Sequence, residues 1–355
     1  GPTATGKSRL AVELALQFHG EVVSADSMQI YRGLAIGTAQ PAEREKRGVP
    51  HHLIGFQDPE QPFSVADYVT LASECIRGIR ERGALPIVAG GTGLYVGALL
   101  HRLDFSPQRK DEALRAELFR KAKTQGPGSV WEELRAFDPE SARRIHPNNV
   151  SRVIRAIEVY RKTGVTMTEQ RKRSRRSPSP YDVCMIGLAC RERAKLYAAI
   201  DRRVDAMMEA GLLKEAERVL ALPSETTARQ AIGYKEFLPY FEGRCSLGEA
   251  VEQVKRESRR YAKRQMTWFR RQENAEWIYL DEEQGVESVS RRAVEIFCCE
   301  QSGSETDRDT VYRLVDPLLC RVPDLSFPLL QHPHGDRVLF YRFRVGSGER
   351  LCGER

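Results

Sequence analysis

The run Gly1-Pro-Thr-Ala-Thr-Gly6-Lys7-Ser8 restricts the fold of this chain more than any other feature, because it fits the pattern G-x-x-x-x-G-K-[ST]. Its glycines permit a tight turn, whose backbone N–H groups and following helix N-terminus attract an anion. Lys7 adds a positive charge, and the Ser8 hydroxyl is suited to bind Mg²⁺ held by phosphate oxygens. The run predicts a diphosphate guest with magnesium as cofactor, the alternative being a chance glycine turn. A strand that precedes such a loop would lie before Gly1.

Apolar patterning predicts helices and buried strands that alternate along the chain. The runs EVVSADS, ALPIVAGG, VCMIGLA and EWIYL are typical of strands, and the segments between several of them have helical spacing. In chain order, the predicted elements are a helix at residues 8–18, strands at 21–27 and 84–91 with a helix at 68–82 between them, a strand at 183–189, amphipathic helices up to residue 271 and a strand at 276–280. This order indicates an α/β fold, a P-loop NTPase-like parallel sheet with helices on both faces.

One segment interrupts this pattern. Residues 109–179 are strongly charged, have helical spacing and lack apolar strand runs, and they end in the basic stretch RKRSRRSPSP. We expect an α-helical insertion domain there, within a catalytic core formed by residues 1–108 and 180–300. Residues 301–355 mix Ser/Glu/Asp-rich sequence with Pro-rich apolar pieces and predict an atypical tail, with disorder as one interpretation.

Composition excludes several classes of protein. No run of about 18 apolar residues occurs, so neither a membrane span nor a membrane partner is predicted, and a cytoplasmic location is expected. The eight cysteines form no Cys-x-x-Cys pair, and the seven histidines form no metal motif, so no zinc or redox role is predicted. The net charge of +7 matters only where positive residues cluster.

Positive residues cluster in two segments. Residues 251–271 hold eight lysines and arginines against two glutamates, and residues 161–176 hold seven against one acid. In the first segment the basic residues recur at helical spacing, while Val254, Tyr261 and Trp268 recur on another face that we expect to be core. Two basic surfaces beside one pocket suit an RNA stem-loop. A solvated charged face is the alternative.

Two strand ends are candidates for catalysis. Ligands of a doubly wound sheet lie at the carboxyl ends of its strands, where the phosphate loop also lies. The strand at 21–27 ends near Asp26, and the strand at 84–91 is followed by Thr92. A carboxylate and a hydroxyl are therefore expected to face the bound diphosphate. The alternative is that Asp26 caps a helix that follows it and that Thr92 caps the helix at Leu94.

At these residues the chain resembles bacterial tRNA dimethylallyltransferases, also called tRNA isopentenyltransferases, over residues 1–300. The matching pieces are GPTATGKS, SADSMQIYRGLAIGTAQP, VPHHLIGFQDPEQPFSVADY, PIVAGGTGLY, IHPNNVSRVIRAIEVY, AIGYKEF and KRQMTWFRR. The resemblance implies transfer of a dimethylallyl group from dimethylallyl diphosphate to the exocyclic amine of the adenosine 3′ to the tRNA anticodon. It also implies Mg²⁺ as cofactor, the tRNA anticodon stem-loop as partner and a monomeric enzyme.

The resemblance carries over to individual residues. It implies that Asp26 is the general base and that Thr92 helps to place the adenine. The diphosphate would be held by Thr3, Ala4, Thr5, Gly6, Lys7, Ser8 and Arg193, with Ser8 on the magnesium ion. The residues expected to contact tRNA are Asp26, Ser27, Met28, Gln29, Arg115, Arg152, Arg260, Lys263, Arg264 and Gln265.

The chain departs from the family in one position that bears on this site. Some members carry an arginine three residues before the glycine of the Gly-Tyr motif, where this chain has Gln230 before Gly233. We expect either Arg229 to substitute, or Arg193 and Lys7 to serve the leaving group instead.

Two other functions use the same features. A small-molecule or nucleotide kinase would use the loop for ATP and would need no large basic surface. An RNA-binding regulator would keep its RNA affinity after loss of Asp26 and Lys7 and would form no product. The joint occurrence of the loop, the two strand ends and the basic segments favours prenyl transfer over both.

Overall fold

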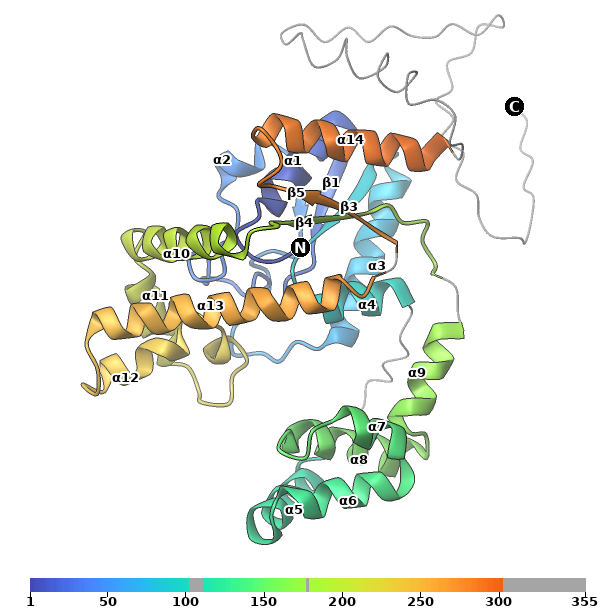
Figure 1. Cartoon of the computed structure of the whole chain (residues 1–355), viewed down its shortest axis with the longest axis vertical. Coiled ribbons are helices and arrows are strands. Elements are labelled where there is room, and N and C mark those ends of the chain that lie inside the picture. Colours follow the sequence, from blue (N-terminus) through green and yellow to red (C-terminus); the bar gives the residue numbers. More distant parts are fainter. Residues whose placement is uncertain (102–110, 177–178, 273, 303–355) are drawn as a thin grey trace, which may run out of the picture. The chain divides into compact units, whose positions relative to one another are not determined.

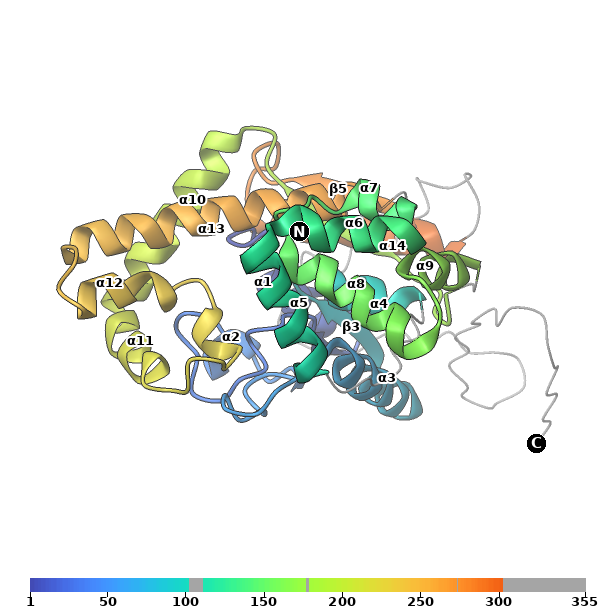
Figure 2. The ribbon, with the colours of Figure 1, turned by 90° about the horizontal axis from the view of Figure 1, so that it is seen from below.

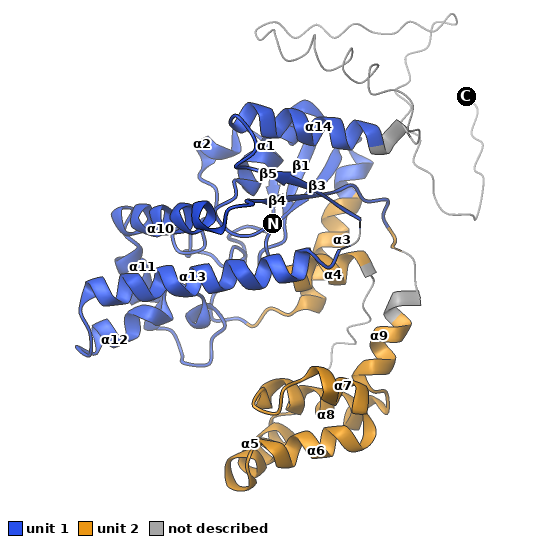
Figure 3. Ribbon diagram, in the orientation of Figure 1, with its two compact units in different colours: residues 1–61, 78–91, 181–355 blue, residues 62–77, 92–180 orange. Residues whose placement is uncertain are grey.

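The computed structural model describes residues 1–101, 111–176, 179–272 and 274–302, which belong to two compact units (Figure 3). The first unit holds residues 1–61, 78–91 and the described residues from 181 onward. The second holds residues 62–77 and the described part of 92–180. Helix α3 (Val65–Glu81) is divided between them. The tail predicted at 301–355 lies outside the described residues, except for the last two residues of α14 (Val286–Ser302).

The first unit contains a three-stranded parallel sheet of order β2-β1-β3. Its strands are β1 (Gly20–Ser24), β2 (His51–His52) and β3 (Leu85–Ala89). All five residues of β1 are buried, as expected for a central strand covered on both faces. Helix α1 (Lys7–Gln17) packs Ala11, Val12 and Ala15 against Val22 and Val49. This packing fixes the helix that follows the phosphate loop beside the central strand.

A second parallel sheet pairs β4 (Met185–Ala189) with β5 (Ala275–Tyr279). Leu10 of α1, Leu188, Ile278 and Val289 of α14 form one buried cluster, so α1 contributes to the cores beneath both sheets (Figure 1). The sequence predicted one parallel sheet, whereas the described residues form two. Gly1 lies beside the second sheet, since a Cβ added there would come within 2.5 Å of the Leu188 carbonyl oxygen.

Helices make up most of the rest of the first unit. They are α2 (Glu43–Lys46), α10 (Arg193–Glu209), α11 (Leu212–Leu220), the 3₁₀ turns η1 (Ala228–Gln230) and η2 (Lys235–Phe237), α12 (Leu238–Phe241) and α13 (Leu247–Phe269). Ser246 caps the N-terminus of α13, where its side chain accepts a hydrogen bond from the Glu249 backbone N–H in a capping box. Helices α10 and α13 run alongside one another in both views (Figures 1 and 2).

The second unit is helical throughout its described residues. Besides its part of α3 it contains α4 (Gly93–His101), α5 (Glu112–Gln125), α6 (Pro127–Phe137), α7 (Pro139–Arg144), α8 (Val150–Thr163) and α9 (Met167–Arg176). Leu118, Val130, Leu134 and Ile157 lie in its buried core. This unit also takes in residues 62–77 and 92–101, which the sequence assigned to the catalytic core. The overall α/β class predicted from the sequence is confirmed.

Glu158 is a buried charged residue in the second unit. Its carboxylate is fully buried and accepts hydrogen bonds from Arg115 Nε at 3.0 Å and Nη2 at 2.8 Å, from Arg155 Nη1 at 2.7 Å and from the Asp111 backbone N–H at 2.7 Å. Burial alone would raise the pKa of Glu158, but these donors outweigh it and lower the pKa to about 2. Arg115 was expected to contact tRNA. Arg115 is partly exposed and makes a fork-like contact with Glu158, which gives it a structural role in this unit, and its contact with tRNA stays a prediction.

We predict that E158A destabilises the second unit by roughly 3–5 kcal/mol, because it leaves the Arg115 guanidinium without its buried partner. The pKa of Glu158 is lowered on folding, so its stabilising contribution is present at neutral pH and is lost as the pH falls from about 4.5 toward about 2. Thermal unfolding followed by circular dichroism measures both effects. The matched control is E169A, since Glu169 makes an exposed pair with Arg173. Equal melting temperatures for the two variants would contradict the assignment.

Candidate active site

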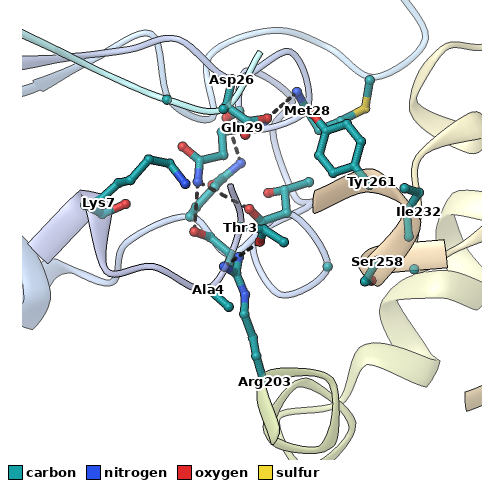
Figure 4. A pocket seen from close by; sticks show the side chains of 18 of the residues that line it. Thr3, Ala4, Lys7, Asp26, Met28, Gln29, Arg203, Ile232, Ser258 and Tyr261 are labelled. Atoms are coloured by element: carbon teal, nitrogen blue, oxygen red, sulfur yellow. Dashed lines mark hydrogen bonds between the residues drawn. The ribbon is translucent and has the colours of Figure 1, made fainter. Parts of the chain in front are cut away.

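A cavity of about 880 Å³ lies within the first unit (Figure 4). Its wall contains the phosphate loop, the turn after β1, the end of β3 and one side each of α10 and α13. The predicted residues that line it are Thr3, Ala4, Thr5, Gly6, Lys7, Ser8, Asp26, Ser27, Met28, Gln29, Arg264 and Gln265. The sequence therefore located the phosphate loop, the turn after β1 and part of the α13 wall.

The phosphate loop is curled by its own hydrogen bonds. The Thr5 hydroxyl donates to the Pro2 carbonyl oxygen at 2.8 Å, and the Lys7 ammonium donates to the same oxygen. Ala4 and Gly6 have positive φ angles of 62° and 73°, and α1 begins directly after Gly6. The left-handed angle costs Gly6 little but strains Ala4. The N-terminus of α1 thus opens on the cavity, as the motif predicts.

Thr3 connects the loop to the helices around it. Its backbone N–H donates to Gln265 Oε1 at 2.9 Å, and its hydroxyl oxygen accepts from Arg203 Nη1 at 2.9 Å. Gln265 Nε2 in turn donates to the Gly91 carbonyl oxygen at 2.9 Å. Gln265 was expected to contact tRNA, but it is only 5% exposed. Its burial argues against that expectation, and its side chain instead joins the phosphate loop to the end of β3.

The backbone segments that follow β1 and β3 lie in close contact. A Cβ added at Gly90 would lie 2.2 Å from the Ala25 carbonyl oxygen, so only glycine fits there. Asp26 Oδ1 accepts from the backbone N–H groups of Met28 at 2.9 Å and Gln29 at 3.3 Å. The carboxylate therefore caps a turn, and no helix follows it. Asp26 also lines the cavity, so it can cap this turn and face a bound ligand at the same time.

Positive charge gathers around the loop. Burial lowers the pKa of Lys7 to about 8, with a further lowering by the nearby Arg203 charge and an opposing effect of Asp26. Burial also lowers the pKa of Arg203, and Asp26 again opposes the shift. Two cations and one carboxylate therefore share a poorly hydrated site, which is an environment that stabilises a bound anion.

Arg203 is one of the cavity residues that the sequence prediction missed. Arg193 was assigned to the diphosphate, but it is exposed in the first turn of α10 and is not part of the cavity wall. Ten residues separate the two arginines, which is about 15 Å along a helix. A sequence signal was present, because Arg203 follows the buried Leu196 and Ile200 by seven and three residues and so lies near the apolar face of α10. Gln230 lines the cavity, whereas Arg229 donates to the Leu222 carbonyl oxygen.

The predicted tRNA contacts occupy different environments. Arg260, Lys263 and Arg264 are exposed on α13, and the Arg264 guanidinium carbon lies 5.6 Å from the centre of the Tyr261 ring. Gln29 is engaged inside the loop region, where its side chain accepts from the Ser24 hydroxyl and donates to two backbone carbonyls. In the second unit, Arg152 is exposed on α8.

Thr92 is described within the second unit. Its backbone carbonyl oxygen accepts from Tyr95 and Val96 at the start of α4. Its catalytic role stays a prediction.

Val254 and Tyr261 were expected in the core. The structure corrects this in part, since both line the cavity, with Val254 buried and Tyr261 half-buried. The apolar face of α13 is therefore a wall of the site as well as a packing surface.

Comparison with known proteins identifies the family. Residues 29–272 match the family model described as IPP transferase, and residues 1–54 match that described as isopentenyl transferase. The chain belongs to the IPP transferase family. It is 49% identical to the tRNA dimethylallyltransferase of Acetivibrio thermocellus over 284 residues, which cover 79% of this chain and 90% of that protein. The family resemblance read from the sequence is confirmed.

Solved structures agree with this membership. The full-length tRNA isopentenylpyrophosphate transferase of Bacillus halodurans has a TM-score of 0.59 and 41% identity, over 90% of this chain and 93% of that one. A eukaryotic dimethylallyltransferase acting on tRNA has a TM-score of 0.72 and 27% identity, over 94% and 89%. The similarity thus extends over most of each chain.

We predict that Q265L loosens the phosphate loop, because it leaves the Thr3 N–H and the Gly91 carbonyl without partners. The loss should lower stability by about 1–3 kcal/mol and weaken inhibition by inorganic diphosphate. Thermal unfolding and inhibition assays measure the two effects. T267A is the matched control on the same helix, since the exposed Thr267 hydroxyl donates only to its own helix at Lys263. Unchanged diphosphate inhibition in Q265L would contradict this role.

Proposed function

We propose that this chain transfers a dimethylallyl group from dimethylallyl diphosphate to the exocyclic amine of the adenosine 3′ to the anticodon in tRNA. The observation that carries the proposal is that an anion-binding loop and a carboxylate line one cavity in a member of the IPP transferase family. We also propose that the fold is a P-loop NTPase-like parallel sheet. The enzyme acts as a monomer in the cytoplasm, where tRNA is modified.

The reaction exchanges two bonds. The allylic carbon–oxygen bond breaks and its electron pair leaves with the diphosphate, while the adenine nitrogen forms a bond to the same carbon. The amine proton passes to the Asp26 carboxylate. Negative charge grows on the diphosphate in the transition state, and preorganised backbone N–H groups together with Lys7 stabilise it. Asp26 supplies the base that a weakly nucleophilic aromatic amine requires.

Magnesium would be held by diphosphate oxygens together with Ser8. The residue fits this role, because Ser8 lies in the first turn of α1, is exposed and lines the cavity. Among the described residues no group of three or more His, Cys, Asp or Glu could hold a metal ion, so most of the ligands would come from phosphate and water. When bound, the ion would neutralise charge on the leaving diphosphate.

The tRNA would meet exposed positive residues. An adenine stacked in an anticodon loop must turn out of the stack to enter a cavity, at a cost of a few kcal/mol. Arg260, Lys263, Arg264 and Arg152 are exposed and suited to phosphate contacts that offset this cost. The turn at Ser27 and Met28 lines the cavity where the base would enter, and Thr92 is proposed to help place it. No described helix is long and apolar enough to cross a membrane.

The deciding experiment is incubation with Mg²⁺, dimethylallyl diphosphate and unmodified tRNA, followed by mass analysis of the digested nucleosides. We expect a prenylated adenosine. In a parallel incubation with ATP added, consumption of ATP with unmodified RNA would instead establish the kinase alternative, which the family membership does not favour. RNA binding without any product would establish the RNA-binding regulator.

We predict that D26N lowers kcat roughly 10²- to 10⁴-fold with tRNA affinity unchanged. Asparagine keeps the oxygen that accepts from Met28 and Gln29, so the substitution removes the base but preserves the turn. Single-turnover kinetics and filter binding measure the two quantities. D58N is the matched control, because Asp58 is exposed and likewise caps a turn by accepting from the Glu60 N–H at 2.8 Å. Equal activity in both variants would exclude Asp26 as the base.

We predict that diphosphate binding to the free enzyme weakens as the pH rises through about 8, the pKa of Lys7. The protonated ammonium attracts the anion and the neutral amine does not, so affinity is lost on the alkaline side. Inhibition constants of inorganic diphosphate between pH 6.5 and 9.5 measure the effect. In K7R the guanidinium stays charged, and the step near pH 8 should vanish. A step that persists in K7R would assign it to another group.

A further inference from the structure

We propose that Glu215 of α11 is a positioning residue, which fixes the Asp26 carboxylate although Glu215 is not part of the cavity wall. The inference rests on the proposed function, in which Asp26 is the base. Glu215 acts through residues 34–41, which we call the wall loop because its residues 37–41 line the cavity. The wall loop is joined in turn to Gln29 and to the turn that Asp26 caps.

The first link is a buried carboxylate. Glu215 is 3% exposed, and its Oε2 accepts from the Ile36 backbone N–H at 3.0 Å while Oε1 accepts from the Gly37 backbone N–H at 2.7 Å. Among the residues that the structure describes, Glu215 forms no ion pair, so neutral donors alone stabilise its charge. A buried carboxylate is costly without such donors. The wall loop is therefore bound to α11 at two consecutive backbone N–H groups.

Tyr234 fixes the same carboxylate. Its hydroxyl donates to Glu215 Oε1 at 2.9 Å, and the whole residue is buried. Burial and the neighbouring Glu215 charge raise the pKa of the Tyr234 phenol, so the hydroxyl stays protonated and donates. A Cβ added at Gly37 would lie 2.6 Å from the Tyr234 ring, so the ring contacts the wall loop where only glycine fits. Hydrogen bonds and packing thus hold the loop at one point.

Gln29 joins the wall loop to the turn of Asp26. Its Nε2 donates to the carbonyl oxygens of Thr38 at 3.2 Å and Ala39 at 2.9 Å. Gln40 Nε2 donates in return to the Gln29 carbonyl oxygen at 2.9 Å. The Gln29 backbone N–H donates to Asp26 Oδ1 at 3.3 Å, and Figure 4 shows the two residues side by side. Gln29 is therefore bonded both to the wall loop and to the Asp26 carboxylate.

This chain of contacts affects the base and not the phosphate loop. A general base must lie within roughly 2.6–3.2 Å of the group it deprotonates. A displacement of about 1 Å can cost on the order of 10²-fold in rate. The phosphate loop is held separately, through the bonds of Thr3 to Gln265 and Arg203. Loosening the wall loop should therefore slow the chemical step and leave diphosphate binding intact.

The test compares E215Q with E217Q, because Glu217 is exposed on the same helix. In E215Q an amide NH₂ replaces one acceptor oxygen and faces a donor. We expect kcat to fall about 10- to 100-fold, with inhibition by inorganic diphosphate within about twofold of the wild type. E217Q should match the wild type. An unchanged kcat in E215Q, or an equal loss of kcat and of diphosphate inhibition, would overturn the proposal.

The double variant D26N/E215Q tests whether Glu215 acts through Asp26. Once the base is absent its position no longer matters, so E215Q should lower the residual single-turnover rate of D26N by less than about twofold. Loss of the same factor in both backgrounds would contradict the inference. If E215Q does not fold by circular dichroism, Y234F replaces it in the same cycle, with at least about a threefold loss of kcat expected where Asp26 is present. A Y234F variant with wild-type kcat would then overturn the proposal.

Hydrogen exchange separates this inference from the proposed function, because it needs no substrate. Residues 28–41 contain the backbone N–H groups that donate to Asp26 and to Glu215. Mass spectrometry should show faster exchange in this segment in E215Q than in the wild type or E217Q. If it does, but the wild type forms no prenylated nucleoside, the proposed function fails and the link from Glu215 to the Asp26 turn stands. If E215Q forms prenylated nucleoside as fast as the wild type, the inference fails and the proposed function stands.

Discussion

The hydrogen bonds that hold Thr3 from two sides determine the geometry of the site. One partner, Gln265, is 262 residues away in the sequence, and the other, Arg203, is 200 residues away. The phosphate loop at the start of the described chain is therefore shaped by helices formed much later. Contacts of such long sequence separation form late and slowly in folding. The loop motif alone does not make an anion site; the packed unit does.

Electrostatics in the first unit divides into two patterns. Where α10 and α13 face each other, cations and acids neutralise one another in pairs such as Lys255 and Asp205. At the loop, Lys7 and Arg203 remain in excess over Asp26, at the cost of a lowered pKa for both. Sites that bind charged ligands commonly keep an excess of one charge, whereas the charges in the rest of a protein are usually paired. The excess of positive charge at the loop therefore contrasts with the paired charges where α10 and α13 face each other.

The sequence predicted what is encoded locally. The loop, the position of Asp26 after a strand, and strands β1, β3, β4 and β5 of the first unit followed from spacing and apolar pattern, whereas the short β2 and α2 did not. It did not predict the partners that side chains choose across long distances. Arg115 turns to a buried glutamate, Gln265 joins two backbone segments, and Arg203 rather than Arg193 lies at the loop. Helical spacing predicts only approximately which face of a helix a basic or polar residue occupies. The partner of that residue depends on which other elements pack against that face.

Ala4 adopts a left-handed backbone angle that glycine would adopt without strain. A residue with a Cβ in that region costs about 1 kcal/mol or more, and the surrounding hydrogen bonds to Pro2 and Thr3 hold it there. In exchange, alanine leaves the loop fewer alternative shapes than glycine would. The anion then meets a receptor that is already shaped, and little of its binding energy is spent on ordering the peptide that surrounds it.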